Sequence, residues 1–577
     1  MKSKEAAVRK RKRWIILGII VALVIVGVVV ARREPHIVPG SYLVVDIGGT
    51  YAEAPPAGLV SQLLDSGQQV LTDLLLELRK ATVDTRLQGV IVKVAPIDMD
   101  FAQVQELRAA LQGLKAAGKR VVAWVSGEGD SGNHEYYLAS VADRVYFTQN
   151  TILPLLGLRA TAIFLGGVWE KIDIDMQVEQ MKEYKTFGDF LGRKSMSEAH
   201  REMTNSLLDS LHEQLLTDIA GARGLPTTLV RAFIDAPTLT SEDYLTAGLI
   251  DGIVSFDQLV EEVVVTPEKL VSLPTYRGVK AASVGLIGGP KIAVVYGVGA
   301  VQSGESDWEV TGEAMGANTI IKAFKEAVDD DDIRAIVFRI DSPGGSALAS
   351  DLIWQAVSHA KKTKPVVVSM AGVAASGGYY IACSATKIVA QPATLTGSIG
   401  IVFSLPNIQG LLDKLGISTE TLERGRFARL FDPSKAWSAE DRQQVQRLLA
   451  TLYRTFTRRV AEGRGLNVDE VDRIGGGRVW TGAQAKELGL VDQLGGLDTA
   501  LRVAREEAGI PADMGLRLVF YPSPKHLLET LLERFTGQMH MARLLPSPLR
   551  ELGRWVTAFG GPEDGPRFLM PVLLRIK

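Results

Sequence analysis

The sequence predicts an α/β protein made of two tandem copies of one unit, each with a mostly parallel sheet, preceded by one transmembrane helix. Three observations support this fold class. The chain repeats itself once, short apolar strands alternate with amphipathic segments of helix length, and a basic N-terminus leads into an uncharged apolar run. A chain of 577 residues is also too long for one ordinary hydrophobic core.

The N-terminus predicts a membrane anchor. Residues 1–13 are rich in lysine and arginine, and residues 14–31 form an apolar run without charges. At about 1.5 Å rise per residue, roughly 18 residues are just long enough to cross the hydrocarbon core of a bilayer. A cleaved signal peptide is the alternative, but its apolar region is usually shorter and ends in a small-x-small site, whereas Arg32 and Arg33 follow here.

The basic segment predicts the orientation of that anchor. Under the positive-inside rule residues 1–13 stay in the cytoplasm, so the rest of the chain lies outside it. In a bacterium with two membranes this location is the periplasmic side of the inner membrane. No later segment is apolar enough to span, so we expect a single pass, with the lipid bilayer as a partner through residues 14–31.

The internal repeat determines the predicted architecture. Its copies keep the same order of elements, and in each an amphipathic helix pattern passes through an acidic turn into a β-branched strand. We assign the first copy to residues 42–271, the second to residues 291–508 and a C-terminal extension of unassigned role to residues 509–577. The matching pairs of segments are Leu76–Val94 with Ala323–Ile340, 136–139 with 379–382, and 247–251 with 488–492.

Apolar strands and long helices fill each copy. Near-continuous apolar runs are typical of strands buried on both faces of a parallel sheet, and their alternation with helices predicts βαβ units. The expected strands are Ile91–Val94, Val121–Val125, Val337–Ile340 and Val366–Met370, and the expected long helices are Glu198–Ala220 and Glu440–Ala461. A further amphipathic helix is expected at His526–Phe535.

Composition excludes several classes of function. The formal net charge of −2 gives no reason to expect a nucleic-acid partner. Cys383 is the only cysteine, so an intramolecular disulfide and a cysteine-based metal site are both excluded, and we expect this thiol to be a small buried hydrophobe. We predict no cofactor and no metal.

The segment VVVSMAGVAASGGYY, residues 366–380, places a serine where a buried strand turns into a helix that we expect to begin at Tyr379. A nucleophile in such a turn is exposed beside outward-pointing amides, so Ser376 is a candidate. A serine that merely caps the helix is an equally good interpretation of this segment alone.

A second glycine-rich loop follows a neighbouring strand. In DSPGGS, residues 341–346, a pair of glycines can turn an amide toward a reacting carbonyl and so form half of an oxyanion hole. An ordinary Pro-Gly turn is the alternative. The two loops together are more specific than either one alone.

The first copy lacks these features. Its nucleophile loop, Gly129–Glu135, has Asn133 near the position of the serine, and its oxyanion segment, Ala95–Asp98, has no glycine. It has instead Lys185, whose matching position in the second copy is Arg426. Lysine can act as a base once desolvation lowers its pKa, whereas arginine stays protonated. The complementary loss predicts one composite Ser–Lys site across both copies.

Two alternatives to this base stay open. A solvated surface lysine is the default for Lys185 taken alone. A Ser–His–Asp site is recognised by geometry that a sequence does not show, although no histidine lies in a matching motif. The chain has seven histidines, at positions 36, 134, 200, 212, 359, 526 and 540.

The segments DSPGGS, AASGGYYIA, ATLTGSIGI and YKT together resemble the signal peptide peptidase A family in its long, duplicated bacterial form. The resemblance covers residues 42 to 508 and implies a Clp protease/crotonase-like fold. It further implies an N-terminal anchor, a homotetrameric dome on the outer face of the cytoplasmic membrane, and cleavage of signal peptides and other hydrophobic peptides.

The same resemblance implies roles for five residues. Ser376 matches the nucleophile, Lys185 the general base, Gly345 and Gly377 the oxyanion donors, and Ser398 the serine that orients the lysine amine. Two small departures are Asp341, where asparagine is frequent, and Thr186, where serine is frequent; neither removes a catalytic atom.

Two rival functions remain possible for such a chain. Crotonase-like folds also bind acyl-CoA, and a membrane-tethered scaffold would need no chemistry at all. The Ser–Lys pair and the extracytoplasmic location favour a peptidase. A lysine base further predicts a depressed pKa and a rate that rises on the alkaline side.

Overall fold

The computed structural model describes residues 34–55, 69–129, 132–236, 240–264, 266–286, 288–306, 314–522, 567–569 and 575–576. The predicted anchor, residues 14–31, and the predicted helix His526–Phe535 lie outside these ranges. Among the helices in the described ranges, none has both the length and the apolar character needed to cross a membrane.

The first repeat forms a parallel sheet with the strand order β2-β1-β3-β4-β5-β8, and β9 also pairs with β1. Its strands are β1 (Ser41–Ala52), β2 (Gln69–Val70), β3 (Leu87–Asp98), β4 (Arg120–Val125), β5 (Arg144–Phe147), β8 (Gly252–Ile253) and β9 (Leu270–Ser272). Its helices are α3 (Leu71–Val83), α4 (Phe101–Ala116), α5 (Asn133–Ala139), α8 (Glu198–Arg223), α9 (Thr227–Asp235), α10 (Ser241–Thr246) and α11 (Phe256–Val263).

The second repeat has the same order of elements around the strand path β21-β10-β13-β15-β17-β19, with β16 on β15 and β20 on β16. The strands are β10 (Lys291–Val298), β13 (Ile333–Ser342), β15 (Val366–Ala375), β16 (Lys387–Ala390), β17 (Leu395–Gly397), β19 (Val479–Thr481), β20 (Gln493–Leu494) and β21 (Arg517–Tyr521). The helices are α13 (Ala317–Asp329), α14 (Ala347–Ala360), α15 (Gly377–Ala382), α17 (Ala439–Arg464), α18 (Val468–Ile474), α19 (Gly482–Glu487) and α20 (Leu497–Glu507). β21 comes from residues 509–577, the predicted C-terminal extension, and pairs with β10 as β9 pairs with β1, so the sheet of the second repeat continues past residue 508.

The prediction of mostly parallel sheets is confirmed. All the predicted apolar strands lie inside observed strands, and side chains on both faces of them are buried: Val337, Phe338 and Ile340 of β13 have no exposed surface. The pairing of β17 with β19 is antiparallel. One detail differs, because β15 continues to Ala375 and α15 begins at Gly377, two residues before the expected helix start.

A third sheet joins the repeats, with the order β12-β11-β14-β22-β18-β7. Its strands are β7 (Asp175–Gln180), β11 (Ala300–Gln302), β12 (Ala314–Gly316), β14 (Gly344–Ser346), β18 (Val402–Asn407) and β22 (Arg567–Leu569). β7 of the first repeat pairs with β18 of the second along its whole length. Beside this pair lie α6 (Gly166–Lys171), α7 (Phe187–Gly192) and α16 (Gln409–Lys414), and the short strands β6 (Ala160–Thr161) and β23 (Arg575–Ile576) pair with each other.

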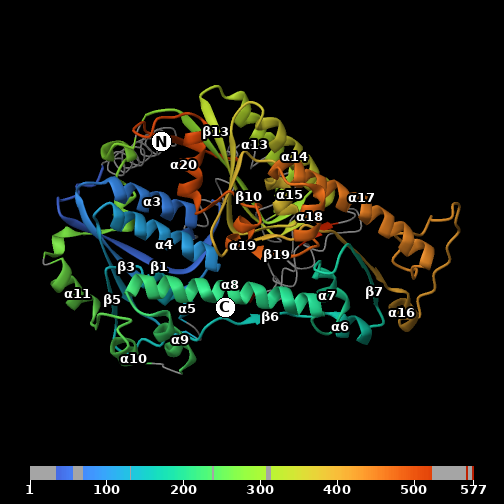
Figure 1. Ribbon diagram of the computed structural model, residues 1–577, viewed down its shortest axis with the longest axis horizontal. Helices are drawn as coiled ribbons and strands as arrows, with labels where there is room; N and C mark the ends of the chain where they lie inside the picture. The colour runs from blue at the N-terminus through green and yellow to red at the C-terminus, as the bar shows by residue number, and fades with distance from the viewer. Residues whose placement is uncertain are drawn as a thin grey trace, which may run out of the picture.

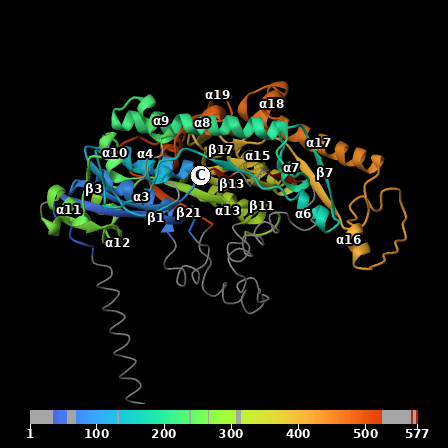
Figure 2. The same ribbon diagram turned by 90° about the horizontal axis from the view of Figure 1, so that it is seen from below.

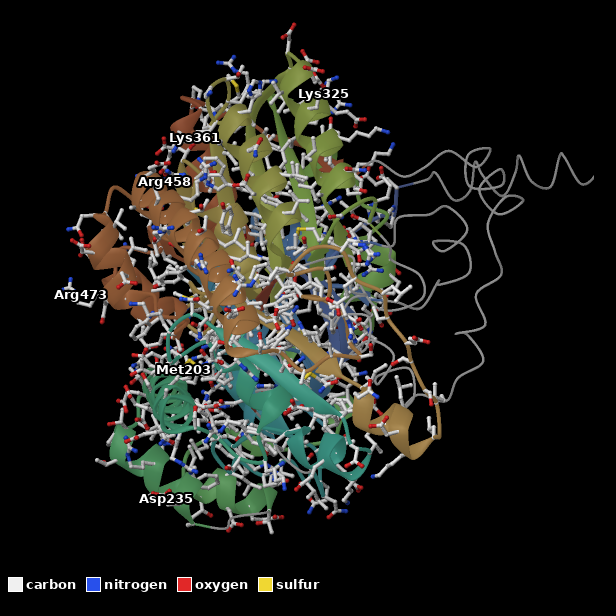
Figure 3. The ribbon with its side chains drawn as sticks, turned by 90° about the vertical axis from the view of Figure 1, so that its right-hand side faces the viewer. Met203, Asp235, Lys325, Lys361, Arg458 and Arg473 are labelled. Atoms are coloured by element: carbon white, nitrogen blue, oxygen red, sulfur yellow. The ribbon has the colours of Figure 1, made fainter. Side chains whose placement is uncertain are left out.

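The long helices α8 and α17 pack at the boundary between the two repeats. In Figure 1 α8 runs horizontally beneath α3 and α4 of the first repeat and on toward α7, and seen from below α8 and α17 lie along one side of the molecule (Figure 2). Met203 of α8 belongs to a buried cluster with Ala375 and Val479 of the second repeat. Figure 3 shows this methionine where α8 meets the second repeat. The N-terminal end of α8 therefore lies next to the strand that leads to Ser376.

A buried ion network also connects the repeats. The guanidinium of Arg339 on β13 donates to Glu53 Oε1 at 2.6 Å and to Glu106 Oε2 at 2.6 Å. Arg339 has no exposed surface, and both glutamates belong to the first repeat. A buried charge that loses its partner is strongly destabilising, so these contacts couple the two sheets.

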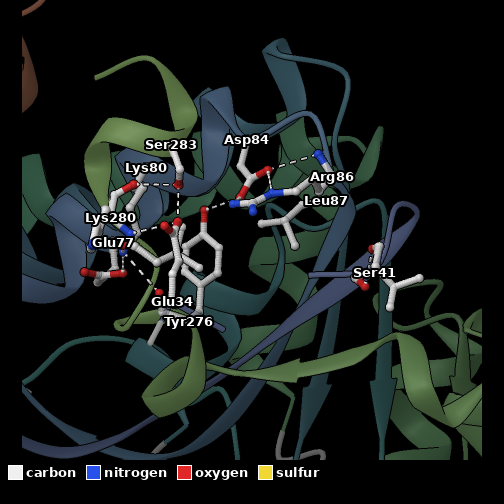
Figure 4. Close-up of polar contacts among 12 residues, drawn as sticks. Glu34, Ser41, Glu77, Lys80, Asp84, Arg86, Leu87, Tyr276, Lys280 and Ser283 are labelled. Carbon is white, nitrogen blue, oxygen red and sulfur yellow. Dashed lines mark hydrogen bonds and ion pairs between the residues drawn. The ribbon is translucent and has the colours of Figure 1, made fainter. Parts of the chain in front are cut away.

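The connection between the repeats docks on the first repeat, as Figure 4 shows. Lys80 donates from Nζ to the carbonyl oxygens of Tyr276 and Val279, at 3.2 and 2.9 Å. Glu34, where the described chain begins, accepts hydrogen bonds from the Lys280 backbone amide and the Ser283 hydroxyl. The chain that leaves the predicted anchor is thus attached to the linker.

Candidate active site

Ser376 lies in a strained turn between β15 and α15. Its φ of 56° and ψ of −112° are unusual for a residue other than glycine, and such strain often accompanies function. Its amide donates to the Gly397 carbonyl at 2.8 Å, and its own carbonyl accepts from Tyr380 N at 2.8 Å. Its side chain makes no capping hydrogen bond to α15, so the helix-cap interpretation does not describe this serine.

Lys185 reaches this hydroxyl from the other repeat. The residue lies in the turn between β7 and α7, and its Nζ lies 2.6 Å from Ser376 Oγ. Both side chains are fully buried, so the surface-lysine interpretation is wrong. The printed hydrogen bonds of its amine, within the described residues, go to serine oxygens and none to a carboxylate. Desolvation holds the pKa of Lys185 well below the usual lysine value.

Ser398 provides the other contacts of the lysine amine. Lys185 Nζ lies 2.9 Å from Ser398 Oγ and 3.0 Å from the Ser398 carbonyl oxygen. A neutral amine has two N–H donors and one lone pair, so it can donate to both Ser398 oxygens and still accept the Ser376 hydroxyl proton. Ser398 itself has a positive φ of 52°, and its amide donates to the Arg478 carbonyl at 2.7 Å.

A glycine-rich wall surrounds the lysine, and the sequence analysis did not identify it. A methyl group on Gly477 would lie 2.4 Å from the Lys185 backbone nitrogen, and one on Gly400 would lie 3.2 Å from Lys185 Cδ. Tyr184 N donates to the Gly476 carbonyl at 3.1 Å. The run of three glycines at 475–477 was the available signal, because such a run indicates close approach of another backbone.

Gly345 and Gly377 lie side by side. A methyl group on Gly377 would lie 3.0 Å from the Gly345 backbone nitrogen and 2.7 Å from Ser350 Oγ. Gly345 is the middle residue of β14, and Gly377 directly follows Ser376. The Gly345 backbone nitrogen therefore lies beside the residue that follows the candidate nucleophile, which is the neighbourhood in which an oxyanion hole would form.

The first copy uses its equivalent positions for structure. Asn133 donates from Nδ2 to the Gly157 carbonyl at 2.6 Å, and its Oδ1 accepts from Leu156 N at 3.2 Å. Glu135 Oε1 accepts a hydrogen bond from Ile97 N at 2.6 Å, so the backbone amide of Ile97 is already paired with a carboxylate. Ile97 lies near the end of β3, at the place where the second copy has its glycine-rich loop.

Other candidates lie elsewhere. Arg426, the expected counterpart of Lys185, is exposed and forms an ion pair with Glu440. His200 lies beside Asp189 at 3.4 Å, and His134 packs against Phe101. In the described part of the chain no histidine is hydrogen-bonded to Ser376, whose hydroxyl contacts Lys185 Nζ. Cys383 is fully buried.

Comparisons with known proteins identify the family of the chain. The sequence profile of peptidase family S49 matches residues 113–268 and 358–511, and that of Clp protease matches residues 310–399. The chain is 35% identical to "Serine protease SPPA, chloroplastic" of Arabidopsis thaliana, over 78% of this chain and 68% of the relative.

Two bacterial proteins are also similar over most of their length. The chain is 29% identical to "Protease 4" of Salmonella typhi, over 90% of this chain and 87% of the relative. It is 28% identical to "Protease 4" of Haemophilus influenzae, over 75% of this chain and 72% of the relative.

Proposed function

Because the chain belongs to peptidase family S49 and is a serine peptidase with a Clp protease-like α/β fold, we propose that Ser376 and Lys185 are its catalytic dyad. One observation carries this proposal: the amine of one repeat lies 2.6 Å from the hydroxyl of the other, and both are fully buried. A buried, neutral lysine at hydrogen-bond distance is what a general base for serine requires.

The proposed reaction begins with proton transfer. Neutral Lys185 takes the proton of Ser376, whose oxygen attacks the peptide carbonyl and forms a tetrahedral intermediate. The amides of Gly345 and Gly377 hold the oxyanion, and each such donor contributes about 2.7–4 kcal/mol to transition-state stabilisation. Ser398 holds the amine in place through its carbonyl and hydroxyl oxygens.

The acyl-enzyme then forms and is hydrolysed. Protonated Lys185 gives its proton to the leaving amine as the peptide bond breaks, which leaves the acyl group on Ser376. Lys185 next takes a proton from water, the resulting hydroxide attacks the ester carbonyl, and the proton returns to Ser376. The dyad ends in its starting state.

The substrates proposed for this site are signal peptides already released from their proteins, and other hydrophobic peptides. The resemblance of the loops at 341–346 and 374–382 to signal peptide peptidase A supports this substrate class. The apolar run at 14–31, with the basic residues before it, supports a single-pass inner-membrane anchor with the two repeats on the periplasmic side. The proposed assembly is a homotetramer of chains whose repeats span 42–271 and 291–508.

A peptide-cleavage assay tests the proposal. A chain lacking residues 1–33 keeps Ile37, which packs in the core of the first repeat. It should cleave apolar peptides faster than strongly polar ones. Lys185→Ala should lower kcat by about 10²–10⁴-fold, the contribution typical of a general base. Ser376→Ala removes the nucleophile and should lower kcat by up to about 10⁶-fold. Lys182→Ala, an exposed lysine on the same segment, is the matched control.

Three results would contradict this function. Activity that survives Lys185→Ala would point to another base. Equal cleavage of polar and apolar peptides would exclude the proposed substrate class. An inert parent chain that is correctly folded would favour a scaffold.

A further inference from the structure

The third sheet contains a strand that comes from the C-terminal end of the chain. β22, residues 567–569, lies between β14 and β18 and pairs antiparallel with both. Its register places Phe568 opposite Gly345 and Arg567 opposite both Ser346 and Val402. Without β22, β14 and β18 would be two unpaired strand edges separated by the width of one strand.

We call the space between β14 and β18, which β22 fills, the slot. It lies next to the candidate active site. β14 carries Gly345, whose amide lies against Gly377. β22 also packs against α15, the helix that begins directly after Ser376. An extended peptide bound in this slot therefore has its backbone next to the nucleophile and the glycine amides. With β22 in place, Ser376 has no exposed surface.

The slot can bind a peptide through the peptide's backbone. A peptide that adds to a sheet edge gains affinity from backbone hydrogen bonds. Because the slot has a strand edge on each side, a peptide in it can form such bonds with both edges. Any extended peptide, including a segment of this chain, satisfies this requirement. β22 is thus a competitor for the place that a substrate strand needs.

A second contact holds the end of the chain. β23, residues 575–576, pairs antiparallel with β6, so that Arg575 lies opposite Thr161 and Ile576 opposite Ala160. β6 belongs to the first repeat, whereas β14 and β18 belong to the second. The C-terminal segment therefore contacts both repeats.

We propose that residues 567–569 are a built-in competitive inhibitor, a strand that occupies the substrate slot between β14 and β18 and must leave before a peptide binds. This regulation rests on the proposed peptidase function of the same site. A tethered segment has an effective concentration of roughly 1 mM. If its intrinsic Kd is roughly 0.1 mM, it lowers the apparent kcat/KM on the order of tenfold.

The experiment changes the strand within the full-length chain and also compares a chain without residues 567–577. Phe568→Pro removes a backbone N–H and restricts φ, so it opposes pairing, whereas Phe568→Ala keeps the N–H and is the matched control. A chain that ends at Pro566 removes the strand altogether. We expect kcat/KM for an apolar reporter peptide to rise on the order of tenfold in Phe568→Pro and in the shortened chain, and to stay unchanged in Phe568→Ala.

A binding measurement separates this proposal from the dyad. In a Ser376→Ala background no hydrolysis is needed, and fluorescence anisotropy follows a labelled synthetic peptide that covers residues 561–577. The peptide should bind the shortened chain and should bind the full-length chain at least several-fold more weakly. If the chain with Ser376 intact cleaves no peptide and this difference in binding is still found, the dyad is refuted and the inhibitor stands.

Two outcomes would overturn the inhibitor. One is equal kcat/KM in the full-length and shortened chains together with no binding of the labelled peptide. The other is a mass spectrum in which the full-length chain is cut within residues 567–569 and its Ser376→Ala variant is intact, because the strand would then be a substrate and not a resident inhibitor.

Discussion

Replacing Lys185 by methionine should change how stability depends on pH. Methionine has a similar volume and carries no titrating proton, so it removes the amine without leaving a large cavity. The amine is fully buried, and desolvation lowers its pKa well below the usual lysine value. The unfolded chain exposes the same amine to water, where its pKa is about 10.4.

These two pKa values determine the sign of the effect. Between the lowered folded value and about 10.4, the unfolded state holds one more proton than the folded state, so stability rises with pH. The destabilisation of the folded state that comes from burying the amine is fully present at a pH below the folded-state pKa. It has disappeared at a pH above the unfolded-state pKa. Within this window the free energy of unfolding of the parent chain should rise by about 1.4 kcal/mol per pH unit relative to Lys185→Met.

Urea unfolding at pH 7, 8 and 9 measures this slope. The parent chain and Lys185→Met are compared at each pH, and Lys182→Met, which replaces an exposed lysine paired with Asp472, is the control. This control shows how much of the pH dependence follows from removing any lysine of this segment. A constant difference between the parent chain and Lys185→Met would refute the reasoning, because the buried amine would then titrate as it does in water.

Three further predictions test the surroundings of the dyad. Ser398→Ala removes the hydroxyl 2.9 Å from the amine of Lys185, a contact of about 1 kcal/mol, so kcat should fall roughly fivefold at unchanged KM in a peptide assay. Gly477→Ala should abolish peptide cleavage because its methyl group would lie 2.4 Å from the lysine backbone nitrogen. Gly416→Ala, with a similar positive φ and open space around it, should keep full activity; equal loss in both would mean that backbone strain alone is responsible. Arg339→Met leaves two buried glutamates without their partner and should lower the free energy of unfolding by about 3–5 kcal/mol in urea titrations, and a loss below 1 kcal/mol would exclude a coupling role.

The duplication made much of the fold predictable. Buried parallel strands have a clear signature, and the runs at Val337–Ile340 and Val366–Met370 lie inside β13 and β15 as expected. The repeat also served as an internal comparison, because each copy lacks what the other retains. The comparison of the two copies predicts that Ser376 and Lys185 share one site, and their side chains are hydrogen-bonded in the structure.

Contacts between distant segments were not predictable. Arg339 lies in an apolar strand, and nothing in its local pattern indicates that Glu53 and Glu106 surround it. The close approach of Gly477 to Lys185 depends on how the two repeats pack, which periodicity does not specify. The position of β22 likewise depends on tertiary pairing. The anchor at 14–31 stays a prediction.

Phosphonylation of Ser376 by a fluorophosphonate probe, in which the serine oxygen displaces fluoride from phosphorus, tests the composite site most directly. The probe reacts with an activated serine and reports the nucleophile alone, and peptide mapping locates the label. The dyad predicts that the parent chain is labelled at Ser376, at a rate that rises with pH as the lysine loses its proton, and that labelling falls at least about 10²-fold in both Lys185→Ala and Lys185→Arg. Labelling of Ser376 at the parental rate in either variant would contradict it.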